Sequence, residues 1–208
     1  MLQRSTIEPS TLDLLKQLLD LPALNSFYLV GGTALALKFG HRISVDLDLF
    51  SIVDFDKKEL IKVLSENYST FKYREDNNTI GLFCKINNIK VDLVKHHWFK
   101  TIDKADELEG IRMFGNKDLL AMKVSAILKR GQKKDFYDLA ELLKIYKISD
   151  CIDFYKEKFP THQIIISIPH AITYFEDAET SPDPVSLYGK TWEDVKKELQ
   201  QHVRDFLS

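Results

Sequence analysis

The sequence predicts an α/β (α+β) fold: a mixed strand-and-helix region over residues 1–115, followed by an all-helical region over 116–208 packed on it. Short apolar runs that read as strands alternate with helical segments in the first half, and only helical periodicity remains from Asn116 onward. No linker-like or repeated stretch separates the halves. With 208 residues, of which 44% are hydrophobic, the chain can bury roughly 70% of its unfolded surface.

The overall charge excludes one class of nucleic-acid binder. The chain has 29 Lys and Arg against 31 Asp and Glu, so its net charge is −2, which rules out a chain-wide basic coat but permits a local basic patch. The two cysteines form neither a CxxC pair nor a zinc pattern and are expected to be free thiols. No run of 18 apolar residues and no apolar leader occurs, so we expect a cytoplasmic protein with no membrane association.

Leucine spacing predicts a first helix that opens at Ser10 or Thr11 and ends before Pro22. The apolar strand 27–30 is stopped by Gly31-Gly32, and a helix over 33–39 follows with Gly40 after its end. Alternation of polar and apolar residues predicts a strand over 45–50. The remaining front elements are a helix at 56–67, strands at 71–74, 79–86 and 89–94, and a hairpin turn at Asn87-Asn88.

The second half shows apolar residues at helical spacing. The helix that begins at Lys117 carries its apolar stripe at i, i+4, i+7 and i+8. We expect a loop at 181–184, where two prolines stand. The expected helices are 117–129, 134–147, 150–158, 162–174 and 192–206.

Three acidic residues are candidate metal ligands. On a strand, Asp46 and Asp48 project to one face while Val45, Leu47 and Leu49 turn to the core. Asp92 stands inside a later apolar strand. Neighbouring carboxylates repel unless a cation lies between them, and all-oxygen sites suit Mg²⁺ or Mn²⁺. Three such groups can hold two metals; taken singly, each is equally a solvated or edge-strand charge.

Between the first strand and the next helix, Gly31, Gly32 and Thr33 are candidate phosphate ligands. A helix start offers free N–H groups and a positive dipole end to a triphosphate, and a glycine lets phosphate approach closely. Thr33 adds a hydroxyl and Arg42 a cation. Alone, Gly31-Gly32 is an ordinary turn.

Lys123 and Arg130 stand seven residues apart along the edge of the apolar stripe. Lys123 could thereby reach a cleft and pair with nucleotide phosphate. The alternative is a solvated charged face. Asp135 and Asp138 are i, i+3 neighbours in the next helix, where N-terminal capping explains them as well as catalysis does.

The combination of strand, Gly-Gly, helix, Asp-x-Asp strand and later acidic strand resembles the nucleotidyltransferase superfold of DNA polymerase β-like enzymes. It is more closely similar to the AbiEii/AbiGii-type nucleotidyltransferase toxins. The resemblance rests on residues 31–35, 41–50 and 123–138, with further likeness at 174–179 and Trp192. This sequence departs from the commoner pattern of that family at two places. Lys134-Asp135 stands where the commoner motif has Arg-Asp, and Gly31-Gly32-Thr33 stands where many members have Gly-Gly-Ser or Gly-Ser.

The resemblance implies a metal-dependent enzyme that moves NMP from an NTP to a hydroxyl acceptor, with a nucleotidyltransferase-type sheet. It implies that Asp46, Asp48, Asp92, Lys123 and Asp135 are catalytic, that Lys123 binds nucleotide, and that Asp135 acts near the acceptor. The expected role is the toxin of a toxin–antitoxin or phage-defence system, acting on tRNA or another cellular target beside a cognate antitoxin. The alternatives are a small-molecule, aminoglycoside-like nucleotidyltransferase and a non-catalytic nucleotide-binding module.

Overall fold

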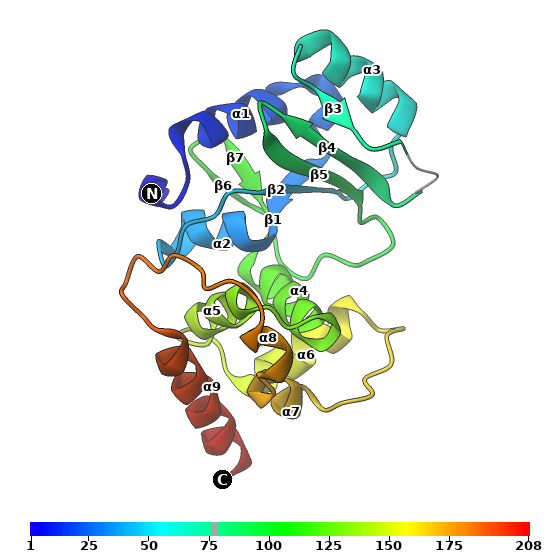
Figure 1. Ribbon diagram of the computed structural model, residues 1–208. Helices are drawn as coiled ribbons and strands as arrows, with labels where there is room; N and C mark the ends of the chain where they lie inside the picture. Colours follow the sequence, from blue (N-terminus) through cyan, green and yellow to red (C-terminus); the bar gives the residue numbers. More distant parts are fainter. Residues whose placement is uncertain (76–78) are drawn as a thin grey trace. The chain divides into compact units, whose positions relative to one another are not determined.

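The computed structural model describes residues 1–75 and 79–208, which form two compact units (Figure 1). Unit 1 consists of residues 1–38, 44–99 and 105–114, and unit 2 of 39–43, 100–104 and 115–208. The sequence pattern predicts a single division after residue 115. Instead, two short segments of the front half, 39–43 and 100–104, belong to the helical unit.

Within the described residues, unit 1 contains a seven-stranded mixed sheet with the order β3-β4-β5-β2-β1-β7-β6. Strand β2 pairs with β1 antiparallel and with β5 parallel. The strands are β1 (Phe27–Val30), β2 (Leu47–Ser51), β3 (Lys72–Tyr73), β4 (Gly81–Ile86), β5 (Ile89–Lys95), β6 (Asp106–Leu108) and β7 (Ile111–Met113).

The two faces of this sheet differ in polarity. Leu29, Leu49, Leu93 and Leu82 are consecutive register partners across β1, β2, β5 and β4, and all are fully buried. They form the apolar face. The residues between them point to the opposite face, as the two-residue period of a strand requires.

The helices of unit 1 are α1 (Pro9–Asp20), α2 (Gly31–Phe39) and α3 (Lys57–Asn67), with short 3₁₀ turns at Arg4–Thr6 and Pro22–Leu24. Pro9 stands in the first turn of α1, where its missing N–H costs nothing. The expected helices are therefore present, with ends shifted by one or two residues.

Unit 2 is helical, with α4 (Asn116–Lys129) in contact with α5 (Lys133–Leu142), α6 (Ile148–Lys158) and α7 (Ile168–Thr173). Two further helices are α8 (Glu176–Glu179) and α9 (Trp192–Leu207). The helix expected over 162–174 forms only from Ile168, because Pro169 fits the first turn of a helix but not its interior. Ser167 caps this shorter helix.

Two strand predictions were incomplete. The β6–β7 hairpin was not expected because each strand has three residues, too few for a visible alternation; Glu109 and Gly110 turn it with positive φ angles. Val45 was expected in the core but is 58% exposed, because β2 begins only at Leu47.

Asn87 and Asn88 have positive φ angles at the predicted turn between β4 and β5.

Both cysteines, Cys84 and Cys151, are free and buried, and burial raises the pKa of each thiol to about 12. They are therefore unreactive thiols at neutral pH. Among the described residues, no helix combines the length and the apolar character that crossing a membrane requires.

Candidate active site

The glycine pair lies where β1 passes into α2. The helix begins at Gly31 rather than at Thr33, so the pair forms the first turn of α2 itself. Gly31 has a φ of +70°, and a Cβ at this position would lie 2.7 Å from Oδ2 of Asp48. A side chain there would strain the backbone and collide with the carboxylate. Glycine is therefore what lets the start of α2 lie against Asp48.

Thr33 is turned inward, with 1% of its surface exposed. Its hydroxyl donates to the carbonyl oxygen of Asp46 and lies 2.8 Å from Oγ of Ser44. The single hydroxyl proton is thus used inside the protein, whereas the sequence pattern predicts that this hydroxyl contacts phosphate. Thr33 instead holds the segment that leads into β2.

Two of the predicted carboxylates are paired by strand register. Asp48 on β2 lies opposite Asp92 on β5, and Val30, the last residue before the glycine pair, lies opposite Asp48 on its other side. Asp46 immediately precedes β2. Asp48, Asp92 and the glycine start of α2 therefore lie together on one face of the sheet, and Asp46 stands two residues before Asp48 in the segment that leads into β2.

Lys90 lies among these carboxylates, although sequence reasoning assigned it no role. Its Nζ is 2.7 Å from Oδ2 of Asp92. Partial burial works to lower the pKa of the Lys90 ammonium, but the hydrogen bond and ion pair with Asp92, and the attraction of Asp48 and Asp46, leave that pKa raised. The ammonium therefore lies within the field of all three carboxylates. The signal was in the sequence, since Lys90 and Asp92 are i, i+2 on a strand.

In the parts of the chain that the structure describes, no three carboxylate, imidazole or thiol groups gather closely enough to hold a metal ion together. One feature nevertheless fits a cation: Oδ1 of Asp92 is buried and has no hydrogen-bond partner in the described residues, which is costly for a carboxylate. The donor set consists of carboxylate oxygens, which suits Mg²⁺ or Mn²⁺.

The charged residues of unit 2 form a buried network centred on Asp138, which is completely buried. Arg42 binds both oxygens of this carboxylate, with Nε at 2.7 Å and Nη2 at 2.9 Å. Nε2 of His41 lies 2.7 Å from Oδ1, and Nζ of Lys123 lies 2.6 Å from Oδ2. Burial tends to raise the pKa of Asp138, but Arg42 and Lys123, with the hydrogen bonds from His41 and Arg42, hold it well below its usual value.

Lys123 and Asp135 extend the same network. Nζ of Lys123 is 3.0 Å from Oδ1 of Asp135, and Arg130, 54% exposed, contributes Nε at 3.4 Å from Oδ2. Asp135 also accepts from the backbone N–H of Gln132 in a capping box at the start of α5. Burial works against the charge of Lys123, but Asp138 and Asp135 raise its pKa overall.

The structure thus gives the rear motif a different setting from the one predicted. Lys123 and Arg42 were expected to face nucleotide phosphate, but they are 6% and 3% exposed and bound to Asp138. Asp135 caps its helix, the alternative that the sequence left open. The sequence did not predict the central role of Asp138. The sequence signal for it is its spacing, four residues after Lys134 and one helical turn after Asp135.

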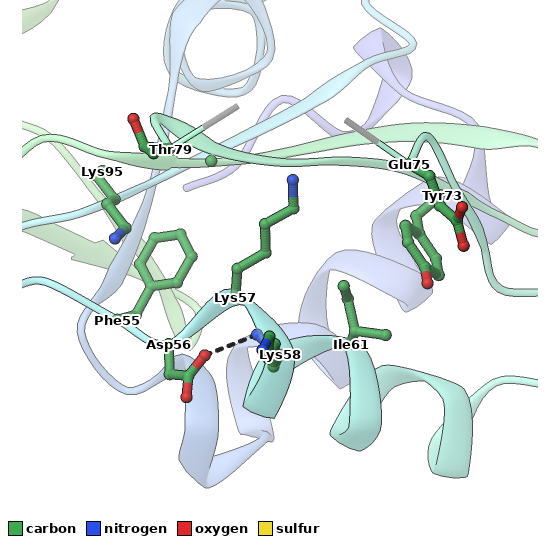
Figure 2. A pocket seen from close by; sticks show the side chains of 10 residues that line it. Phe55, Asp56, Lys57, Lys58, Ile61, Tyr73, Glu75, Thr79 and Lys95 are labelled. Carbon is green, nitrogen blue, oxygen red and sulfur yellow. Dashed lines mark hydrogen bonds between the residues drawn. The ribbon is translucent and has the colours of Figure 1, made fainter. Parts of the chain in front are cut away.

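A pocket of about 840 Å³ opens elsewhere in unit 1, between the start of α3 and the strands β3, β4 and β5. Figure 2 shows the Lys57 side chain extending into it between Phe55 and Ile61. Lys95 lines this pocket and is three residues from Asp92 on β5, so the two side chains leave opposite faces of the sheet. None of the predicted site residues lines the pocket.

Comparison with known proteins identifies relatives along nearly the whole chain. The uncharacterized protein aq_aa25 of Aquifex aeolicus is 30% identical over 200 residues, covering 93% of this chain and 94% of its own length. The fold is similar to that of JHP933 from Helicobacter pylori (TM-score 0.57, 18% identity, 95% of this chain and 92% of that one). It is also similar to that of MenT4, a nucleotidyltransferase toxin from Mycobacterium tuberculosis (TM-score 0.53, 14% identity, 94% and 82%).

The family itself follows from a profile match. Residues 13–207 match the family described as nucleotidyl transferase AbiEii toxin, type IV toxin–antitoxin system. The match includes the glycine pair, all three carboxylates and the Asp138 network. The chain belongs to the AbiEii family of nucleotidyltransferase toxins, and it is a nucleotidyltransferase with the fold of those enzymes.

Proposed function

We propose that this enzyme transfers NMP from an NTP to a hydroxyl acceptor in a reaction that depends on Mg²⁺ or Mn²⁺, with Asp46, Asp48 and Asp92 as the metal ligands. The observation that carries the proposal is the register pairing of Asp48 with Asp92 beside the glycine start of α2. Two carboxylates in adjacent register repel each other at neutral pH. Lys90 offsets part of this repulsion, and a divalent cation would offset more of it.

The first turn of α2 supplies the complementary part. Gly31 and Gly32 present backbone N–H groups and the positive end of the helix dipole to an anion. The acceptor oxygen forms a bond to the α-phosphorus as the bond to the bridging oxygen breaks, and pyrophosphate leaves. A metal held by Asp46, Asp48 and Asp92 would neutralise charge on the leaving pyrophosphate and would lower the pKa of the acceptor hydroxyl.

For the rear motif we propose a positioning role. Arg42 and His41 are bound to Asp138, and two residues further along the chain Ser44 contacts Thr33, which holds Asp46. The network thus orders residues 39–43 of unit 2, which immediately precede Ser44 in the chain. Of the three predicted nucleotide-binding cations Arg42, Lys123 and Arg130, Arg130 has the exposed guanidinium and is the one that we keep for nucleotide contact.

For the biological partners we propose an NTP as the donor and tRNA or another cellular target as the acceptor, in the cytoplasm. We further propose that the enzyme is a toxin that an antitoxin counteracts and that serves in phage defence. The family description supports the toxin–antitoxin context.

The test is label transfer from each α-³²P-labelled NTP to total RNA. EDTA should abolish transfer and Mn²⁺ or Mg²⁺ should restore it. Asp48→Asn should lower transfer by at least about a hundredfold, since several kcal/mol of charge stabilisation is lost.

Asp13→Asn, at an exposed position of α1, is the matched control and should retain full activity. Transfer that persists in EDTA, or in an equally soluble Asp48→Asn variant, would contradict the proposal. Transfer to a small aminocyclitol but not to RNA would support the aminoglycoside-like alternative.

A further inference from the structure

Three lysines lie directly opposite one another on neighbouring strands of unit 1. Lys72 on β3 is the register partner of Lys85 on β4, and Lys85 is the register partner of Lys90 on β5. All three are exposed. Because register partners share a face of the sheet, they form a row that crosses three strands. With neighbouring strands about 4.8 Å apart, the row is about 10 Å long.

Arg74 adds a fourth cation to this face. Its backbone N–H donates to the carbonyl oxygen of Phe83 at 3.2 Å, and it stands two residues after Lys72, so its exposed side chain leaves the same face. Lys72, Arg74 and Lys85 form no ion pair with any residue that the structure describes. Lys90 is paired with Asp92. These four residues are the lysine row.

Maintaining such a row has a cost. Like charges directly opposite on adjacent strands destabilise a sheet. Lysines on an edge strand prevent edge-to-edge aggregation, and that explains Lys72, since β3 is the edge of the sheet. It does not explain Lys85 and Lys90, because β4 and β5 are interior strands. In a chain of net charge −2, this concentration of positive charge requires another reason.

The position of the row suggests that reason. Along the sheet, the strands β3, β4 and β5 carry the cations, Asp92 and Asp48 follow on β5 and β2, and the glycine start of α2 follows β1. The carboxylates therefore lie between the lysine row on one side and the glycine pair on the other. When a nucleotide is bound at the glycine pair, the acceptor can approach the carboxylates from the other side, where the lysine row lies.

We propose that the lysine row binds the phosphate backbone of a single-stranded nucleic-acid acceptor and leads its hydroxyl end to the carboxylates. The proposal rests on the function proposed above, in which those carboxylates are the reaction centre. Lysine contacts to phosphate are sequence-independent and weaken with salt. The lysine row thus provides affinity for the nucleic-acid chain, and the carboxylates determine where the hydroxyl end of that chain is placed.

The experiment measures binding of a fluorescein-labelled 15-nucleotide single-stranded RNA by anisotropy, in EDTA and over a range of NaCl concentrations. Lys72→Glu/Lys85→Glu should weaken binding by about tenfold or more, and the slope of log affinity against log salt should fall by about 1.4 for two lost phosphate contacts. Binding of Mg²⁺ with each α,β-methylene NTP, measured by calorimetry, should be unchanged. The matched control is Lys62→Glu/Lys197→Glu, at two exposed positions, which should bind RNA like the wild type.

Three results would overturn the inference: no RNA binding by the wild type at low salt, equal RNA affinity in the row and control variants, or an equal loss of nucleotide affinity, which would assign the row to the triphosphate. If the charge reversals do not fold, Lys72→Ala/Lys85→Ala gives the same test with a smaller effect. Failure of the proposed function is separate, because it appears as full transfer activity in Asp48→Asn, and the anisotropy measurement needs no turnover.

Discussion

The two units treat their charged residues in opposite ways. In unit 2, Asp138 is fully buried and receives Arg42, His41 and Lys123 at hydrogen-bonding distances. In unit 1, Asp48 and Asp92 are register partners, Lys90 pairs with Oδ2 of Asp92, and Oδ1 of Asp92 has no partner in the described residues. In the first arrangement both oxygens of the central carboxylate have partners, although Nδ1 of His41 has none among the described residues. In the second, an oxygen of a buried carboxylate itself has no partner, which requires an explanation.

The largest expected effect is on the Asp138 network. Asp138→Asn removes the carboxylate charge that Arg42 and Lys123 share and leaves Asp135 as the remaining carboxylate beside Lys123, so the free energy of unfolding should fall by about 3–5 kcal/mol. Urea denaturation measures this, and exposed Asp153 gives the control Asp153→Asn, which should lie within about 0.5 kcal/mol of the wild type. A small effect at Asp138 would mean that the network contributes little to the stability of unit 2.

The same residue predicts a pH dependence. Because the pKa of Asp138 is lower in the folded than in the unfolded protein, its contribution to stability is complete above the unfolded value of about 3.9 and is lost as pH falls below it. Stability measured from pH 6 to pH 2 should therefore fall less steeply in Asp138→Asn. Parallel curves would contradict the assignment.

Next in size is Lys123, where structural and catalytic roles can be separated. Lys123→Ala should cost about 2–3 kcal/mol of stability, because Asp135 and Asp138 keep Arg130, Arg42 and His41 as partners. We expect induced wild-type protein to slow growth, and Lys123→Ala and Asp135→Ala each to relieve this.

The measurement that separates the two roles of Lys123 is the amount of soluble variant protein in the cell. Under the positioning role, relief follows a loss of folded protein. Under the nucleotide-binding role, the variant stays folded and its affinity for NTP falls. Lys62→Ala, at an exposed position, should leave growth inhibition unchanged. A harmless wild type would remove support for toxicity.

The smallest expected effect on stability is at two glycines that form a matched comparison. Gly31 and Gly110 both have strongly positive φ angles, but a Cβ meets Asp48 at the first and nothing within 4 Å at the second. Gly110→Ala should cost about 1–2 kcal/mol from backbone strain alone. Gly31→Ala should cost more and should also reduce transfer activity, whereas Gly110→Ala should not. Equal losses of transfer activity in the two variants would contradict a role for Gly31 at the active site.

Most of the front motif could be predicted from the sequence because its information is local. A two-residue period puts alternate residues on one face, and a glycine pair ends β1 and starts α2, whatever surrounds them. The sequence also implies the family, through motifs at 31–35, 41–50 and 123–138. The α7 helix was predicted too long because the restriction imposed by Pro169 was overlooked.

The tertiary structure alone decided which charges face solvent and which are buried together. The local sequence does not show the difference in burial between Lys123 and Lys90. Lys123 lies between two buried aspartates, and Lys90 is half-exposed beside Asp92. The lysine row likewise exists only after β3, β4 and β5 have paired, because its members are distant in sequence and register brings them together. The sequence by itself determined the chemistry that the chain carries, because strand period and glycine geometry are local. Strand register and burial decided which groups act together, because both depend on residues far apart in the chain.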